Sequence, residues 1–327
     1  MRAWQIHKLG DPRDVLTLDQ VPDPEPGPGQ VLVRVLGAAA NFPDVLMCQG
    51  AYQVRPPLPF TPGVELCGEV VSLGAGVTGF TAEDRVIGSP ALPSGAYAEL
   101  ALMNADTTLP APDGLDDAEA AAFFITYQTG WFGLHRRARL AAGETLLVQA
   151  AAGGVGSGAV QLGKAAGARV IGVVGGQRKA EVARGLGADV VIDRRSQDFV
   201  AVVKEVTGGR GADVVYDSVG GEAYTKSAKC IAFEGRIVVV GFASGQIPSP
   251  SLNHALIKNY SIVGLHWGLY QTKEPQASHE CHRQLTKLVA DGAIRPLVSE
   301  RLGLEEVPDV LDRLAHGDTI GRVVVTP

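Results

Sequence analysis

Three glycines, Gly153, Gly154 and Gly156, follow an apolar run at 145–148 and precede a segment with helical spacing. The arrangement Ala151-x-Gly153-x-x-Gly156 is the dinucleotide-binding pattern with alanine in place of the first glycine. Glycine lets the backbone approach a pyrophosphate, and the helix N-terminus offers N–H donors to the phosphates. A turn that merely joins two elements is the alternative. The residues predicted to contact a dinucleotide here are Ala152, Gly153, Gly154, Val155 and Gly156.

The residues after the next apolar run indicate which dinucleotide binds. An NAD site usually places Asp or Glu there to accept hydrogen bonds from the ribose 2′-hydroxyl, but no acidic residue occurs between Ser157 and Ala180. Gly175 and Gly176 leave space instead, and basic residues follow on two loops. A cluster of cations suits a 2′-phosphate, whereas a solvated helix start is the alternative. We predict NADPH, bound by Gly175 and by the basic residues Arg178, Lys179, Arg194 and Arg195.

Strands and helices alternate through the region that holds these residues. Continuous apolar runs separated by helices are typical of a parallel sheet buried on both faces, which the right-handed crossover rule makes doubly wound. Six such strands are predicted, and the sixth covers 261–267. Ligands bind at the carboxyl ends of the strands in these sheets. Further cofactor contacts are therefore predicted after the fourth and fifth strands, at Val219, Gly220, Gly241 and Phe242.

The beginning and the end of the chain follow a different pattern. The first 110 or so residues are rich in Pro, Gly and β-branched residues and indicate short strands separated by turns. One helix is predicted over 116–140, and the final strand needs a partner. We predict an α/β fold with a dinucleotide-binding domain at 121–262 and a discontinuous β-rich domain formed by 1–120 and 263–327.

Composition narrows the possible partners. The 327 residues carry a net charge of −6, so no excess of basic residues indicates a nucleic acid or an anionic membrane. No apolar run reaches the roughly 20 residues of a membrane span, and the N-terminus does not have the pattern of a signal peptide. We expect a cytoplasmic protein. Its four cysteines are scattered, without the usual spacing of a structural zinc site.

The whole chain resembles the medium-chain dehydrogenase/reductase superfamily and, within it, the zinc-free quinone oxidoreductase (zeta-crystallin-like) branch. The resemblance implies a GroES-like catalytic domain, a Rossmann domain and a cleft between them that holds the nicotinamide. The segments that carry it are 41–52, 58–86, 95–100, 150–156, 211–221 and 235–245.

The resemblance also bears on metal binding. In zinc alcohol dehydrogenases of this superfamily a Cys occupies the position of Asn41, and a His–Glu pair follows Pro-Gly, where this chain has Val64 and Glu65. Valine has no lone pair for a metal, and an amide is a poor zinc ligand. His279 and His282 share a helix expected to be exposed, without a third ligand. We predict no metal and a structural role for Glu65.

The resemblance implies an acceptor site lined by Asn41, Asp44 and Tyr52. Tyr52 could donate a hydrogen bond or a proton, and Asn41 could orient a ribose hydroxyl or the acceptor. Capping of a short helix is an equal alternative for Asp44. Thr126 matches a threonine on the nicotinamide side in relatives, with an ordinary helix position as the alternative. Three residues at the end of the sixth strand should border the acceptor: Leu265, His266 and Trp267.

These features predict an NADPH-dependent quinone reductase. Without a Lewis acid, acceptors that are already activated are favoured over alcohols and ketones. An enoyl- or acryloyl-CoA or 2-alkenal reductase is the alternative, and a non-catalytic NADPH-binding, crystallin-like protein is the alternative from another class. In relatives the sixth strand joins its copy across a two-fold axis, and the uncharged stretch 259–270 suits a buried edge. We therefore expect a homodimer or homotetramer.

Overall fold

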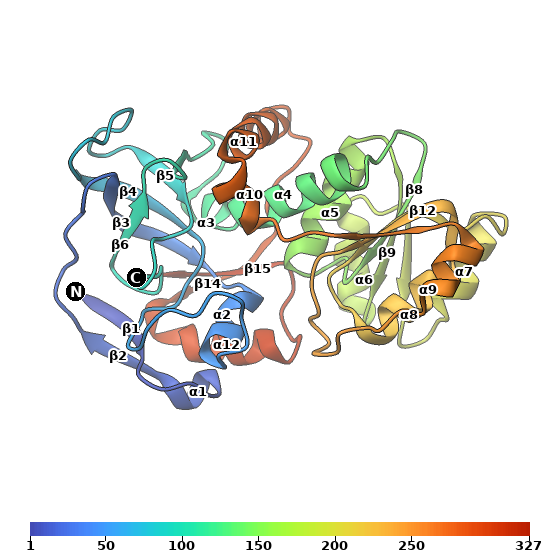
Figure 1. The fold of residues 1–327 in the computed structure, drawn as a ribbon, viewed down its shortest axis with the longest axis horizontal. Coiled ribbons are helices and arrows are strands. Elements are labelled where there is room, and N and C mark those ends of the chain that lie inside the picture. The colour runs from blue at the N-terminus through green and yellow to red at the C-terminus, as the bar shows by residue number, and fades with distance from the viewer. The chain divides into compact units, whose positions relative to one another are not determined.

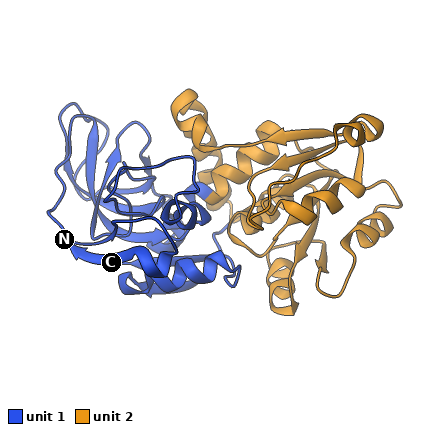
Figure 2. Ribbon diagram, turned by 60° about the horizontal axis from the view of Figure 1, so that its bottom comes forward, with its two compact units in different colours: residues 1–125, 295–327 blue, residues 126–294 orange.

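The computed structural model describes residues 1–327, which form two compact units. Unit 1 comprises residues 1–125 and 295–327, and unit 2 comprises residues 126–294 (Figure 2). These bounds differ from the predicted boundary at 262, because the segment 263–294 packs within unit 2. Its helix α11 (Pro275–Ala290) accepts a hydrogen bond from Trp131 Nε1 at Gln284 Oε1, at 3.1 Å.

Unit 2 is built on a six-stranded sheet in which every pairing is parallel. The strand order is β10-β9-β8-β11-β12-β13. This is the doubly wound order, in which strands are added first on one side of β8 and then on its other side. This confirms the predicted α/β fold. The sixth strand ends at Gly264 rather than at 267. The strands are β8 (Thr145–Gln149), β9 (Arg169–Val174), β10 (Val190–Asp193), β11 (Ala212–Asp217), β12 (Ile231–Val239) and β13 (Ser261–Gly264).

In unit 2, a helix connects each strand of the parallel sheet to the next strand in the chain (Figure 1). Their apolar faces and the strands bury a common core that includes Leu147, Ile171 and Val215. The helices are α5 (Gly154–Ala165), α6 (Gln177–Gly185), α7 (Phe199–Val206), α8 (Gly221–Lys229), α9 (Leu252–Lys258), α10 (Gly268–Lys273) and α11. The expectation that α11 is an exposed helix is wrong on one face, since His282 is only 5% exposed.

The structure has three separate helical segments where one helix was predicted over 116–140. They are α3 (Asp117–Ala121), α4 (Phe124–Trp131) and the π-helical η1 (Phe132–Arg137). The run from Ala120 to Phe124 is fully buried, and the chain passes from unit 1 to unit 2 just after the break, between Ile125 and Thr126 within α4. Helical periodicity alone does not locate such a break, because every side chain around it is apolar.

Unit 1 is centred on β3 (Gln30–Ala39), which lies in a seven-stranded sheet of order β14-β15-β3-β4-β5-β7, with β6 also paired to β3. The C-terminal strand β15 (Arg322–Thr326) pairs with β3 through Val324 and Ala39. The prediction that the final strand rejoins the first domain is therefore confirmed. The other strands are β1 (Arg2–Ile6), β2 (Leu16–Gln20), β4 (Leu66–Leu73), β5 (Arg85–Gly88), β6 (Leu100–Asn104), β7 (Leu109–Pro110) and β14 (Val298–Gly303).

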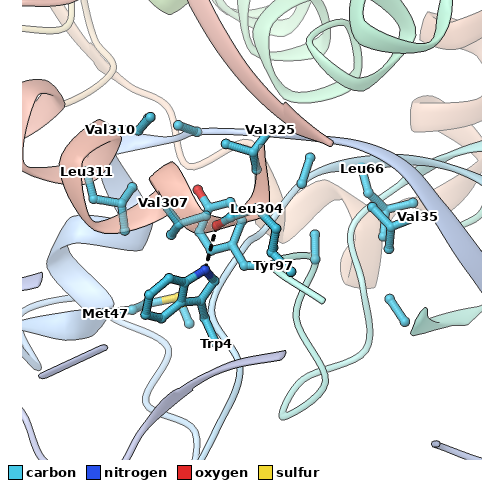
Figure 3. Close-up of a cluster of buried hydrophobic side chains, with 14 of the residues drawn as sticks. Trp4, Val35, Met47, Leu66, Tyr97, Leu304, Val307, Val310, Leu311 and Val325 are labelled. Carbon is cyan, nitrogen blue, oxygen red and sulfur yellow. Dashed lines mark hydrogen bonds between the residues drawn. The ribbon is translucent and has the colours of Figure 1, made fainter. Parts of the chain in front are cut away.

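The core of unit 1 joins the two ends of the chain (Figure 3). Trp4 donates from Nε1 to the carbonyl oxygen of Leu304, at 2.7 Å. Val307 and Leu311 lie in the same buried cluster as Met47. Burial of this apolar surface is the main stabilising contribution to such a core. The helices are α1 (Pro12–Val15), α2 (Phe42–Cys48), the 3₁₀ turn η2 (Leu304–Glu306) and α12 (Val307–Ala315). No helix of the protein has the length and apolarity that crossing a membrane requires.

Candidate active site

The glycine turn after β8 is shaped by close backbone approach. A β-carbon on Gly156 would lie 2.1 Å from the carbonyl oxygen of Ala150, and Ala150 itself has a φ of +51°. Gly153 is the N-cap residue of α5 and brings no side chain over the helix end. The first N–H groups of a helix lack intrahelical partners and carry partial positive charge. The turn therefore fits a diphosphate, which needs backbone donors and the space that a side chain would fill.

The turn after β9 brings two glycines against two arginines. A β-carbon on Gly175 would lie 3.4–3.6 Å from three guanidinium atoms of Arg194, and one on Gly176 would lie 3.1 Å from Nη1 of Arg195. Gly176 has a φ of +101° and begins α6, whose first turn carries the other two predicted cations, Arg178 and Lys179. Both loops of the predicted 2′-phosphate site therefore meet at one corner of unit 2.

The loops after β11 and β12 are bonded to one another. Asp217 ends β11 with its carboxyl group buried, and its Oδ1 accepts N–H bonds from Val219 (2.9 Å) and Gly220 (3.0 Å). Ser244 N–H donates to the carbonyl oxygen of Val219, and a β-carbon on Gly220 would lie 2.8 Å from the Phe242 ring. The predicted contacts Val219, Gly220, Gly241 and Phe242 therefore form one packed pair of loops at the carboxyl ends of adjacent strands.

The remaining predicted residues of unit 2 serve packing as well. Thr126, on α4, is 1% exposed, and its γ-methyl lies 2.8 Å from the β-carbon position of Gly158. Trp267 is buried and donates from Nε1 to Gln128 Oε1, at 3.2 Å. Leu265 is bonded through its N–H to the carbonyl oxygen of Val239, whereas His266 is exposed. These contacts anchor the segment after β13 to its neighbours within unit 2.

Asn41 and Asp44 begin α2 in unit 1. The Asp44 carboxylate is completely buried and accepts three hydrogen bonds: from Asn41 N–H (2.8 Å), Tyr97 Oη–H (2.8 Å) and Val64 N–H (3.1 Å). Burial raises the pKa of Asp44 to about 6, against the opposing effect of these donors. The alternative interpretation of Asp44 as a residue that holds the start of a helix therefore has direct geometric support.

Asn41 is oriented by Glu65. Its Nδ2 donates to the carbonyl oxygen of Ala39 and to Glu65 Oε2, both at 2.9 Å. Both partners are acceptors, so they fix which end of the amide is the nitrogen. Nδ2 is thus directed toward buried acceptors, and Oδ1 is the atom that Asn41 can offer to a hydroxyl donor. This geometry suits the predicted contact with a ribose hydroxyl.

Glu65 is the centre of a buried charge network. It is completely buried and accepts bonds from Asn41, from Ile125 N–H (2.7 Å) and from the guanidinium of Arg322 (2.5 Å), which is 4% exposed. Burial raises the pKa of Glu65, while Arg322 and the other donors act in the opposite direction. A buried carboxylate with one cationic partner and two further donors is well matched, and the predicted structural role of Glu65 agrees with these contacts.

Tyr52 lies in the turn after α2, partly buried against the core of unit 1. Burial, and secondarily the nearby Asp44 charge, raise the pKa of its hydroxyl. Tyr52 therefore keeps its proton at neutral pH and is a hydrogen-bond donor. Arg55, on the same loop, is exposed and reaches the carbonyl oxygen of Tyr52 only at 3.5 Å.

Sequence reasoning missed four residues that hold these sites. Asp193 and Asp217 each end a strand and accept N–H bonds from the loop that follows, a signal visible as an acidic residue directly after an apolar run. Tyr97 lies in the segment 95–100 that carried the family resemblance, but nothing in the sequence indicates its contact with Asp44. Arg322 gives no local signal, because its partner is 257 positions away.

The donor set at the start of α2 does not fit zinc. The Asn41 amide nitrogen already donates to Glu65, and Val64 contributes only its backbone N–H to Asp44. No group of three or more His, Cys, Asp and Glu side chains in residues 1–327 is arranged to hold a metal ion. Neither position 41 nor position 64 carries a thiolate or an imidazole, the side chains that most often bind zinc in proteins.

Two family models cover most of the chain. The alcohol dehydrogenase GroES-like domain matches residues 27–113, and the zinc-binding dehydrogenase domain matches residues 154–283. With the doubly wound unit 2 and the β-rich unit 1, they define an oxidoreductase of the medium-chain dehydrogenase/reductase class. The chain belongs to the quinone oxidoreductase branch of that superfamily, as its relatives show.

Three relatives illustrate the range of the branch. The chain is 37% identical to the quinone oxidoreductase-like protein 2 homolog of Nematostella vectensis over 326 residues, 99% of this chain and 88% of that protein. It matches the structure of Escherichia coli quinone oxidoreductase complexed with NADPH at 31% identity and a TM-score of 0.93, with both chains fully covered. It is also 32% identical to a segment, 15% of the length, of the phthioceranic/hydroxyphthioceranic acid synthase of Mycobacterium tuberculosis.

Proposed function

We propose that the protein is an NADPH-dependent reductase of quinones that works without zinc. The observation that carries the proposal is the corner of unit 2 where Arg194 and Arg195 lie against Gly175 and Gly176, with no acidic residue at the end of β9. A 2′-phosphate there would meet charge-assisted donors. The Escherichia coli relative, solved with NADPH, supports the same choice of cofactor.

The residues then divide by role. The turn at 152–156 would bind the diphosphate, and Val219, Gly220, Gly241 and Phe242 would contact the cofactor from the neighbouring loops. NADPH supplies a hydride to an activated acceptor. Asn41 would accept a hydrogen bond from a hydroxyl through Oδ1. Tyr52, protonated at neutral pH, would donate to the oxygen on which charge develops, and Asp44 would hold α2 in place.

Cofactor preference is tested by dissociation constants for NADPH and NADH. We expect tighter binding of NADPH, and a Lys179→Ala, Arg194→Ala double variant should lose most of the difference, since each charge-assisted bond contributes roughly 1.5–3 kcal/mol. Arg169→Ala is a matched control, because Arg169 is an exposed cation that donates to the carbonyl oxygen of Val206. Equal wild-type affinities for the two cofactors would refute the NADPH proposal.

A second candidate function is the reduction of a carbon–carbon double bond conjugated to a thioester. The 32% identity to a segment of an acid synthase supports it. Exposed Arg55 on the Tyr52 loop could meet a phosphate of such a substrate. NADPH oxidation measured against quinones, 2-alkenals and short enoyl-CoAs separates the two. NADPH binding without turnover on any of them would favour the non-catalytic alternative.

Zinc independence rests on Asn41 and Val64 at positions where zinc enzymes of the superfamily have ligands. We expect elemental analysis of the purified protein to give no stoichiometric zinc and chelators to leave activity unchanged. One zinc per chain, lost together with activity, would overturn this part of the proposal. Cytoplasmic location stays a prediction from the sequence.

We also propose self-association through β13. This strand pairs with β12 alone, and the helix before it exposes Leu252, Leu256 and Ile257 by at least 70% each. An unpaired edge beside an apolar face suits antiparallel pairing with a second copy, which is self-complementary. Light scattering should give at least twice 34.2 kDa. Val263→Lys should lower the mass, whereas Val71→Lys, on an exposed face of β4, should not; a monomeric wild type at micromolar concentration would refute the proposal.

A further inference from the structure

Asp193 is the last residue of β10, and its side chain bonds to two loops at once. Its Oδ1 accepts N–H bonds from Gly176 (2.8 Å), which begins α6, and from Arg195 (3.0 Å), two residues further on in its own loop. Gly176 and Arg195 are 19 positions apart in the chain. One carboxylate oxygen therefore ties the turn after β9 to the loop after β10.

The tie restrains the cations of this corner. Arg194 follows Asp193 directly and is bonded through its N–H to the carbonyl oxygen of Val174, at 2.9 Å. Its guanidinium lies across Gly175, and that of Arg195 lies against Gly176. Gly176 has a φ of +101°, a backbone conformation that favours glycine, and its N–H is the donor to Asp193. Without the Asp193 carboxylate, no side-chain bond would connect the turn at Gly176 to the loop of Arg195 through this position.

The choice of an acidic residue here is unusual on charge grounds. A carboxylate beside a predicted 2′-phosphate repels it, so the presence of one here calls for a compensating role. The N–H groups of Arg195 and Gly176 lower the pKa of Asp193, so it stays ionised at neutral pH. Its backbone partners account for its presence, because a carboxylate oxygen accepts two N–H bonds readily.

We propose that Asp193 is a positioning residue for cofactor selection: by tying Gly176 to Arg195 it holds Arg194 and Arg195 where they meet the 2′-phosphate of NADPH. The inference rests on the proposed NADPH preference and extends it to a residue that need not contact the cofactor. A residue that only stabilises the fold would affect NADPH and NADH binding equally, whereas Asp193 should affect NADPH binding more.

The test compares Asp193→Ala with Asp193→Asn, using dissociation constants for NADPH and NADH on the full-length protein. Alanine removes the acceptor, so NADPH should bind about tenfold more weakly, the equivalent of about 1.4 kcal/mol, with NADH changed by less than about twofold. Asparagine keeps Oδ1 as an acceptor and removes the charge, so it should retain at least the wild-type preference for NADPH.

Two results would overturn the inference: an Asp193→Ala variant with the wild-type preference, or an Asp193→Asn variant that loses it to the same extent as alanine. If alanine prevents folding, Asp193→Ser takes its place with the same expected loss, because the shorter side chain withdraws the acceptor from Gly176 and Arg195. A wild type without preference for NADPH refutes the proposed cofactor and this inference together. A wild type with the preference and an indifferent alanine variant refutes only the role of Asp193.

Discussion

The candidate acceptor residues of unit 1 are held by a network of buried side-chain charges, whereas the candidate diphosphate turn of unit 2 takes its shape from glycines at positions where a side chain would clash. Asn41 takes its orientation from Glu65, which is matched by Arg322. The turn at 153–156 instead takes its shape from the close approach of Gly156 to Ala150. A change that removes atoms should therefore damage the Glu65 network most, and a change that adds atoms should damage the turn at 153–156 most.

The largest effect is expected from Glu65→Ala. It leaves the Arg322 guanidinium buried without its carboxylate and frees the Asn41 amide, so the free energy of unfolding should fall by about 3–5 kcal/mol. Chemical denaturation with urea measures it. Glu69→Ala is the matched control, because Glu69 of β4 forms a surface ion pair with Arg34 of β3. Loss of this pair should cost about 1 kcal/mol or less. Equal losses for the two variants would contradict the view that Glu65 anchors a buried network.

The next effect is expected from Gly156→Ala. The new methyl would lie 2.1 Å from a backbone oxygen, so the turn or α5 must move. Overpacking of this kind costs about 1–3 kcal/mol, and the displaced N–H groups should weaken NADPH binding. Thermal unfolding and cofactor titration together check both effects. A variant with wild-type stability and affinity would show that the turn tolerates a side chain, contrary to the geometry.

The pH dependence of stability offers a smaller and more specific test of the unit 1 network. The pKa of Asp44 is about 6 in the folded protein and near 3.8 when unfolded, so between these values the folded state binds more protons. The stability contributed by Asp44 is therefore present at low pH and falls as the pH rises through this window. Between pH 5 and 7.5 the wild type should lose roughly 1 kcal/mol relative to Asp44→Asn.

The measurement is urea denaturation of both proteins at each pH. The variant loses hydrogen bonds at every pH, but that loss cancels when the difference between the proteins is compared across pH. A difference that stays constant from pH 5 to 7.5 would show that Asp44 does not titrate in this range. The opposite slope would mean that its donors outweigh its burial.

The two units also differ in how far the sequence predicts them. The turn at 153–156 is local, so the glycine spacing together with the apolar run before it and the helical pattern after it predicted a turn between a strand and a helix. The parallel, doubly wound sheet followed from the alternation of strands and helices, and the structure confirms it. Local patterns did not predict the break between α3 and α4, because Ala120–Phe124 is apolar on every side.

The network of unit 1 was only partly predictable. Asn41 and Asp44 carry a helix-start signal three residues apart, and capping was a predicted role for Asp44. The contacts that complete the network come from Tyr97, 53 positions from Asp44, and from Arg322, 257 positions from Glu65. A single sequence carries no information on such pairings, because the chain between them can be routed in many ways. Burial of a charge then becomes visible only in the folded structure.

The smallest expected effect sharpens the argument about glycines in unit 2. Gly185 is the last residue of α6, and a β-carbon there would meet nothing within 4 Å. Alanine favours helices over glycine by up to about 1 kcal/mol, with less expected at a helix end. Gly185→Ala should therefore leave stability unchanged or raise it slightly, and NADPH affinity should not change, because the proposed 2′-phosphate site lies at the other end of α6. Gly187, two residues on, has a φ of +99° and should not accept the same change. Thermal unfolding of these two variants is compared with that of Gly156→Ala. Gly156→Ala measures the cost of a close approach, the alanine variant of Gly187 measures backbone strain, and Gly185→Ala measures only the loss of backbone flexibility. If Gly185→Ala destabilises the protein as much as Gly156→Ala does, the glycines of unit 2 cannot be ranked by what a side chain would meet, and the contrast with unit 1 loses its basis.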